Sequence, residues 1–220
     1  EDFQWDFYNA DGSQAEMCGN AARCVALYVF KKGNKSRKMI FKTLAGPIKA
    51  HVLNHNHVEV GMSPIQKEKR NLKISVEGCD LIVDWVDTGV PHLTVSLDTH
   101  PFLFISPDER TRQVASRLRN HPVLGSIGLK GQNVSLYRIR QPGCIEAISY
   151  ERGVEDFTQA CGTGAVAAAW SYHQNFPQQK AVKVNMPGGL LEVDFSNMNP
   201  LLRGEARFLA EIQLSQDYFS

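Results

Sequence analysis

The sequence predicts an α+β (α/β) protein of two pseudo-symmetric domains. In each domain a curved mixed β-sheet wraps around a central apolar helix. Strand-like segments outnumber helical ones. One central helix is expected in each domain, and it begins at a Cys-Gly pair, Cys18-Gly19 in the first domain and Cys161-Gly162 in the second. The two cysteines lie 143 positions apart, and similarity at this spacing continues along the chain, which indicates a duplicated unit.

The duplication also suggests where the domains end. At the same spacing Gly46 falls on Gly189, and Val58–Gly61 falls on Leu201–Gly204. We predict that residues 1–63 with 207–220 form the first domain and 64–206 the second, with the active site in the cleft between them. The second unit has a long strand-rich stretch before its helix, whereas only seventeen residues precede Cys18. We therefore expect the natural protein to carry a further N-terminal segment.

Composition excludes some classes of function. The chain has 220 residues, of which 43% are hydrophobic and 21% charged, and its formal net charge is +1. These values are typical of a soluble globular protein and argue against binding to nucleic acid or a membrane surface. No apolar run is long enough to span a membrane. Five cysteines without close pairing suggest a reducing compartment, and we expect a cytoplasmic protein.

The first half of the chain has strand patterns around its helix. Alternating polar and apolar residues predict a strand over 2–8, and the helix from Cys18 is expected to end near Gly33. Further strands are expected over 39–43, 48–52 and 57–60, followed by a linker formed by 61–64 and the polar run 66–72. The histidines of this half, His51, His55 and His57, could suggest a zinc site. Their segment has the pattern of a hairpin turn and shows no fourth ligand, so no metal is predicted.

The second half repeats the pattern with one extra helix. Ser106–Glu109 forms a capping box with proline at the first helical position, which predicts a surface helix to about Arg119. From Gly164 to Trp170 every residue is small or apolar, which predicts a helix buried on all sides. Strands are expected over 81–86, 93–97, 132–139, 144–150, 182–185, 190–195 and 207–214.

The two Cys-Gly helix starts suggest a particular chemistry. A helix N-terminus attracts anions and lowers the pKa of a thiol. Two thiols facing one cleft could invert a carbon centre, because one removes a proton from one face and the other returns a proton to the opposite face. The carbanion charge would spread into an adjacent carboxylate, and backbone N–H groups of both helices could stabilise it there. No cofactor motif is evident, and none is required.

The paired cysteines are also compatible with functions of other classes. One cysteine at the start of a buried helix is usually just a small apolar residue, but the equivalent placement of two favours a function. Cys24, Cys79 and Cys144 have no such partner and are expected to be structural. A redox disulfide is a second possibility, although Cys-x-x-Cys is absent. A non-catalytic amino-acid-binding module is a third.

Several motifs together resemble those of diaminopimelate epimerases. They are Asn9-Ala-Asp-Gly-Ser13, Met17-Cys-Gly-Asn-Ala-Ala-Arg-Cys24, Gly89-Val-Pro-His92, Gly131-Gln-Asn-Val134, Glu151-Arg-Gly153, Ala160-Cys-Gly-Thr-Gly164 and Met186-Pro-Gly-Gly189. The resemblance runs through nearly the whole chain in the order of that family. It implies two α/β domains, no cofactor, and inversion of a substrate carbon between two cysteines. It also implies that a last strand near 208–214 returns to the first domain.

The resemblance further implies roles for individual residues. Cys18 and Cys161 would be the acid/base pair, and His92 and Glu151 would assist the thiols or the substrate amine. The residues expected to bind substrate are Gly19, Asn20, Gly162 and Thr163 at the reacting α-carboxylate, and Asn9, Asn133 and Arg152 at the distal end.

Two departures from the family pattern concern the substrate. Val90 replaces an asparagine of the family's Gly-Asn-Pro-His, and valine can neither donate nor accept a hydrogen bond. The family's early Gly-Asn-Asp-Phe motif is missing. Conversion of LL- to meso-diaminopimelate, for lysine and cell-wall precursor synthesis, is the first expectation. A racemase of another amino acid is the alternative, and a homodimer is possible.

Overall fold

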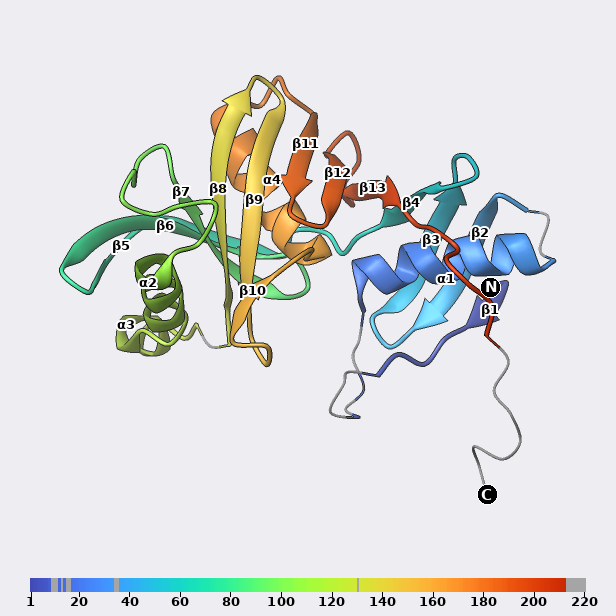
Figure 1. Ribbon diagram of the computed structural model, residues 1–220, viewed down its shortest axis with the longest axis horizontal. Helices are drawn as coiled ribbons and strands as arrows, with labels where there is room; N and C mark the ends of the chain where they lie inside the picture. The colour runs from blue at the N-terminus through green and yellow to red at the C-terminus, as the bar shows by residue number, and fades with distance from the viewer. Residues whose placement is uncertain (9–11, 13, 15–16, 34–35, 130, 213–220) are drawn as a thin grey trace.

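The computed structural model describes residues 1–8, 12, 14, 17–33, 36–129 and 131–212 (Figure 1). The elements, in chain order, are β1 (Phe3–Gln4), α1 (Gly19–Lys32), β2 (Lys38–Thr43), β3 (Gly46–Val52), β4 (His57–Gly61), β5 (Lys67–Val76), β6 (Cys79–Asp87), β7 (Pro91–Ser96), α2 (Glu109–Arg119), α3 (Pro122–Ser126), β8 (Asn133–Gln141), β9 (Cys144–Glu151), β10 (Asp156–Thr158), α4 (Gly162–Asn175), β11 (Ala181–Met186), β12 (Gly189–Asp194) and β13 (Leu201–Glu205). The prediction of an α+β protein with few helices is confirmed.

The thirteen strands of the described residues pair into one mixed sheet. Its order is β1-β2-β3-β4-β13-β12-β11-β9-β8-β7-β6-β5, and β10 pairs with β9 outside this path. The pairs β1–β2, β7–β8 and β9–β11 are parallel, whereas the other pairs are antiparallel. The sheet is therefore continuous through both predicted domains, and the boundaries 1–63 with 207–220 and 64–206 stay a prediction.

The two halves of the sheet join where β4 pairs with β13. In this antiparallel pair Val58 lies opposite Gly204, and Gly61 lies opposite Leu201. At the spacing of 143 residues, Leu201 corresponds to Val58 and Gly204 to Gly61. Each residue thus faces the counterpart of the other, which is the pairing expected across a pseudo-twofold axis. The strand that joins the halves is β13, whereas the sequence placed it at 207–214.

Helix α4 is buried on almost every side and packs on one face of the sheet, against β6–β9, β11 and β12 (Figure 1). Helix α2 packs against β5, β8, β9 and β10, and buries Val114, Ala115 and Leu118. Because helices contact β8 from both faces, its first five residues are all buried.

The sequence predicted one wholly apolar, buried helix in each domain. For helix α1 this prediction was wrong, because α1 is buried on one side only. Ala22, Ala26 and Leu27 lie in the core, whereas Cys24 and Tyr28 are exposed. The reason is that α1 packs against β3, β4 and β13 with one face only. The segment after β13 reaches its outer side, where the ring of Phe208 stacks on Tyr28 with centroids 6.2 Å apart.

Three further local predictions were wrong. The strand expected over 2–8 is limited to Phe3–Gln4. Of the polar run 66–72 that was predicted as a linker, residues 67–72 belong to strand β5, and they are polar because β5 is the edge of the sheet. Helix α2 begins after Asp108, whose carboxylate accepts a hydrogen bond from Thr111 N at 2.8 Å, so aspartate rather than Ser106 is the N-cap. The predicted hairpin between Val52 and His57 is confirmed.

Leu202 of β13 provides a test of this central join. Its side chain is fully buried, and Leu202→Ala should lower the free energy of unfolding by about 2–5 kcal/mol because it leaves a cavity. The control is Met198→Ala, at a side chain that is 90% exposed, which should change stability by less than about 0.5 kcal/mol. Urea denaturation measures both. Equal effects of the two substitutions would contradict the central position of Leu202.

Candidate active site

The two cysteines occupy equivalent positions at the starts of α1 and α4. Cys18 has φ −137° and ψ 116°, and Cys161 has φ −130° and ψ 111°, so the backbone enters both helices in the same way. Each is the N-cap residue, and neither side chain caps its helix. Since the first N–H groups of a helix have no acceptor within it, these amides can serve a bound anion.

The helix starts touch each other. A Cβ atom on Gly162 would lie only 3.4 Å from the Cα atom of Gly19, and on either glycine it would lie 3.1 Å from Cδ2 of Leu202. The Asn20 side chain on α1 donates from Nδ2 to the Ala160 carbonyl at 3.2 Å, across the join. The ends of α1 and α4 converge in Figure 1. The structure therefore brings Gly19, Asn20 and Gly162 together, directly beside the two cysteines.

His92 lies beneath the start of α4 in a chain of hydrogen bonds. Its Nε2 is 3.0 Å from Thr163 Oγ1, which in turn lies 3.5 Å from the sulfur of Cys161. On the other side Nδ1 is 3.0 Å from Ser135 Oγ, which lies 2.9 Å from Ser149 Oγ. Complete burial lowers the pKa of His92 to about 3, so the imidazole is neutral at physiological pH.

The sequence suggested that a helix N-terminus would lower the pKa of the thiols. At Cys161 this is wrong, because burial raises the pKa of its thiol to about 12. The nearby Glu151 carboxylate raises it further, whereas Thr163 and the Gly164 amide act in the opposite direction. Loss of water around the charged sulfur thus outweighs the helix start and the local donors.

The remaining predicted residues gather at one end of the neighbouring strands β7, β8 and β9. His92 on β7 pairs with Asn133 on β8, and Glu151 lies at the end of the neighbouring strand β9. Asn133 Oδ1 accepts the backbone N–H of Arg152 at 2.8 Å, and Glu151 accepts a hydrogen bond from the Thr158 hydroxyl. Arg152, the next residue along the chain, is exposed. Asn9 lies outside the described residues.

The guanidinium of Arg152 lies close to a glycine. Gly131 has φ +70°, which suits glycine, and a Cβ atom there would lie 2.6 Å from Nη1 of Arg152, so any side chain at residue 131 would displace the guanidinium.

Val90 lies in a tight turn just before β7. Its carbonyl accepts hydrogen bonds from the Thr88 N–H at 3.3 Å and from the Thr88 hydroxyl at 3.0 Å. Gly89 has φ +91°, which suits glycine in this turn. The valine side chain itself offers no polar atom.

Three polar residues of this region were not singled out from the sequence. Ser135 and Ser149 are fully buried beside Gly164, where a Cβ atom would collide with the Ser149 hydroxyl. Arg23 is buried in the first turns of α1. The sequence did contain a sign of this residue. Arg23 is a charged residue within an otherwise apolar helix pattern, and its counterpart 143 residues later is Val166.

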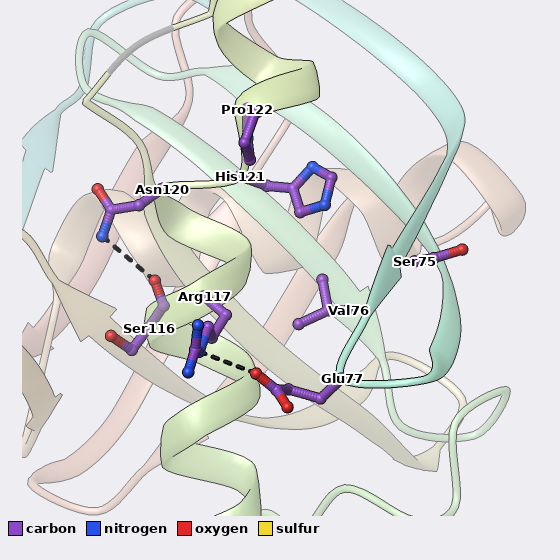
Figure 2. Close-up of a pocket in the computed structure, with 8 residues that line it drawn as sticks. All are labelled: Ser75, Val76, Glu77, Ser116, Arg117, Asn120, His121 and Pro122. Carbon is purple, nitrogen blue, oxygen red and sulfur yellow. Dashed lines mark hydrogen bonds and ion pairs between the residues drawn. The ribbon is translucent and has the colours of Figure 1, made fainter.

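A surface pocket elsewhere is less suited to catalysis. It has a volume of about 430 Å³ and lies between β5 and the end of α2, where Glu77 and Arg117 form an exposed ion pair at 2.8 Å (Figure 2). Asn120 donates to the Ser116 carbonyl in its wall (Figure 2). None of the predicted site residues that the structure describes lines this pocket.

Solved structures with a similar fold include racemases and epimerases. A probable proline racemase from Agrobacterium radiobacter K84 has a TM-score of 0.73 at 16% sequence identity, covering 98% of this chain and 72% of that one. A hydroxyproline epimerase from Agrobacterium vitis has a TM-score of 0.71 at 16% identity, covering 92% and 67%. The fold is thus one that such isomerases use.

Sequence comparisons define the family. The family model for diaminopimelate epimerase matches residues 1–68 and 84–209. The diaminopimelate epimerase of Hydrogenobaculum sp. (strain Y04AAS1) is 33% identical over 99% of this chain and 76% of its own length, and that of Aquifex aeolicus (strain VF5) is 35% identical over 98% and 76%. The chain belongs to the diaminopimelate epimerase family, and it is an isomerase of the epimerase type.

The burial of His92 predicts a pH dependence of stability. In the unfolded chain this residue binds a proton below about pH 6.5, whereas the buried imidazole does so only near pH 3. The folded state should therefore lose stability as pH falls through this window, by about 2 kcal/mol between pH 7 and pH 5 from His92 alone. In His92→Gln this loss should disappear. Urea unfolding of both proteins at the two pH values measures it, and the same pH dependence in both would contradict the neutral buried imidazole.

Proposed function

We propose that the protein epimerises the α-carbon of an amino acid without a cofactor, and that its substrate is diaminopimelate, converted between the LL and meso forms. The observation that carries the proposal is the contact of two helix starts, each with a cysteine as its N-cap. The first-turn amides of both helices have no acceptor within their helix. The names of the relatives in Hydrogenobaculum and Aquifex support this choice of substrate.

The proposed mechanism uses Cys18 and Cys161 on opposite faces of the α-carbon. One thiolate removes the α-proton, and the other residue, as a thiol, donates a proton to the opposite face. Negative charge then spreads from the carbon into the α-carboxylate. Amides of Gly19 and Asn20 on α1 and of Gly162 and Thr163 on α4 would donate to that carboxylate, so that both helix dipoles act where the charge develops.

The surroundings of Cys161 favour its thiol form before substrate binds. Its thiol is buried beside Glu151, and both features raise its pKa. The neutral His92 would hold the Thr163 hydroxyl in place beside the sulfur. We infer that Cys161 enters the reaction as the proton donor, and that Glu151 and His92 assist it without carrying the proton of the substrate.

The distal end of the substrate would meet Asn133 and Arg152. An arginine guanidinium can bind a carboxylate through two parallel hydrogen bonds. Asn133 already accepts the Arg152 N–H through Oδ1, which leaves its amide nitrogen as the donor. Asn9 is expected to contribute here as well.

A racemase of a different amino acid is the second candidate, and Val90 is the observation that favours it. A site that replaces one amide by an apolar side chain suits a substrate with one polar contact fewer. A homodimer and a cytoplasmic location also remain predictions. Within the described residues there is no helix long and apolar enough to cross a membrane.

The acid/base pair gives the most direct test of the proposed reaction. Cys18→Ala and Cys161→Ala should each lower kcat for epimerisation by at least about 10²-fold, because one face of the carbon loses its proton donor. The control Cys24→Ala, at an exposed position of α1, should stay near the wild-type rate. Circular dichroism of the product mixture follows the inversion. Near-native turnover by either alanine variant of the pair would rule out the two-thiol mechanism. Thiol–disulfide exchange of these variants with a test dithiol would favour the redox alternative.

The choice of substrate is tested at Val90. An added amide can supply one hydrogen bond, worth about 0.5–1.5 kcal/mol. Val90→Asn should therefore raise kcat/KM for diaminopimelate by roughly 2- to 10-fold if this position faces the distal end. It should lower kcat/KM for a native substrate that lacks the polar group. A panel of amino acids incubated with both proteins measures this. Efficient use of diaminopimelate by the wild type, with no gain in Val90→Asn, would show that Val90 does not contact the distal end.

A further inference from the structure

Arg23 is a buried cation beside the junction of α1 and α4 that the proposed mechanism does not use. We propose that it is a positioning residue for epimerisation, which fixes the Asn20 side chain that ties the start of α1 to the residue before Cys161. This inference rests on the proposed function, and it names a further residue of the same site.

The guanidinium of Arg23 is held within the first turns of α1. Its side chain is 5% exposed. Nη1 donates to the Gly19 carbonyl at 3.2 Å, and Nη2 donates to Asn20 Oδ1 at 2.9 Å. Burial lowers the pKa of Arg23, yet arginine stays protonated in proteins. A buried charge is costly unless its hydrogen bonds are made, so these two bonds should hold the group firmly.

The bond to Asn20 decides which way the Asn20 amide points. Because Arg23 occupies Oδ1, the amide nitrogen must face the Ala160 carbonyl, to which it donates at 3.2 Å. Without Arg23 the amide could flip, which would place its oxygen against the Ala160 oxygen. Two acceptors would then face each other, and the link between α1 and the residue before Cys161 would be lost.

The guanidinium of Arg23 packs closely against a glycine in the central strand. A Cβ atom on Gly204 of β13 would lie 3.2 Å from Nε and 3.4 Å from Cζ of Arg23, and 2.6 Å from Cδ2 of Leu191. Nε of Arg23 is buried and has no hydrogen-bond partner among the described residues. The equivalent position of α4 is the fully buried Val166. The clamp formed by Arg23 and Asn20 is thus present on one side of the pseudo-twofold axis only.

The clamp matters for inversion more than for proton removal. Removal needs one thiol near the α-proton, whereas inversion needs a second donor at the right distance on the opposite face. A misplacement of about 1 Å can cost about 10²-fold in rate. If the start of α1 shifts relative to α4, the carbanion lives longer and regains a proton from the side that lost it. Exchange with solvent then occurs without inversion.

The experiment compares Arg23→Met and Arg23→Lys with the wild type, using diaminopimelate in D₂O. We expect Arg23→Met to lower kcat for inversion by about tenfold or more, with KM changed less than about threefold. The ratio of two amounts should rise: the amount of deuterium-labelled substrate that is recovered without inversion, divided by the amount of inverted product. Arg23→Lys should recover part of the loss, because an ammonium can still donate to Asn20. The control Arg138→Met, which removes a 3.0 Å ion pair with Glu146 on β8 and β9, should leave the ratio unchanged.

Two outcomes would overturn the proposal. The first is that exchange and inversion fall together in Arg23→Met, with their ratio unchanged, which indicates a smaller amount of folded enzyme. The second comes from a double-mutant cycle of Arg23→Met and Asn20→Ala on the unfolding equilibrium. We expect the two effects to differ from additivity by about tenfold, and additive effects would contradict the clamp. This cycle needs no turnover. If the wild type inverts no amino acid, the proposed function fails while the clamp is still tested.

Discussion

The contact between Gly19 and Gly162 is the constraint on which the site depends. A Cβ atom on either glycine would touch the other glycine at 3.4–3.6 Å and would lie only 3.1 Å from Cδ2 of Leu202, so a larger residue at either position would crowd this contact. Leu202 of the central strand packs beneath both glycines, so the join of β4 and β13 also sets the distance between the helices. The sheet and the site therefore share one pseudo-twofold axis.

Electrostatics on the α4 side follow from burial. The rise of the Cys161 pKa from 9.0 to about 12 corresponds to roughly 4 kcal/mol against the thiolate. A helix N-terminus contributes about 0.3–2 kcal/mol in favour of an anion, which is too little to reverse that cost. The neutral His92 adds no charge. Cys161 is thus held as a thiol before substrate binds, and the two equivalent positions differ through their neighbours, with Arg23 near one and Glu151 near the other.

Sequence periodicity and duplication predicted which residues form the candidate site, but not how those residues contact one another. The spacing of 143 residues identified Cys18 and Cys161, and also the two segments that pair at the centre of the sheet. It could not show that these segments pair with each other, because pairing depends on tertiary contacts. Strand β5 was mistaken for a linker, since the alternation of an edge strand is weakened by its exposed residues and by a bulge between Lys69 and Leu72.

Interactions of polar groups in the interior were the least predictable part. The contact between His92 and Thr163 joins residues 71 positions apart, and the bond of Asn20 to Ala160 spans 140 positions. Local pattern carries no information on such pairs. The prediction that the helix start lowers the pKa of the thiol was also wrong at Cys161. The reason is that burial raises this pKa, and the extent of burial is decided by the whole fold.

The proposed chemistry requires both helix starts to bind one carboxylate. The most direct measurement is a titration of the isotopically labelled protein with diaminopimelate, followed by the chemical shifts of backbone amides. We expect that Gly19 and Asn20 on α1 and Gly162 and Thr163 on α4 shift together, with one dissociation constant. Shifts confined to one helix start, or centred on the pocket between β5 and α2, would contradict it.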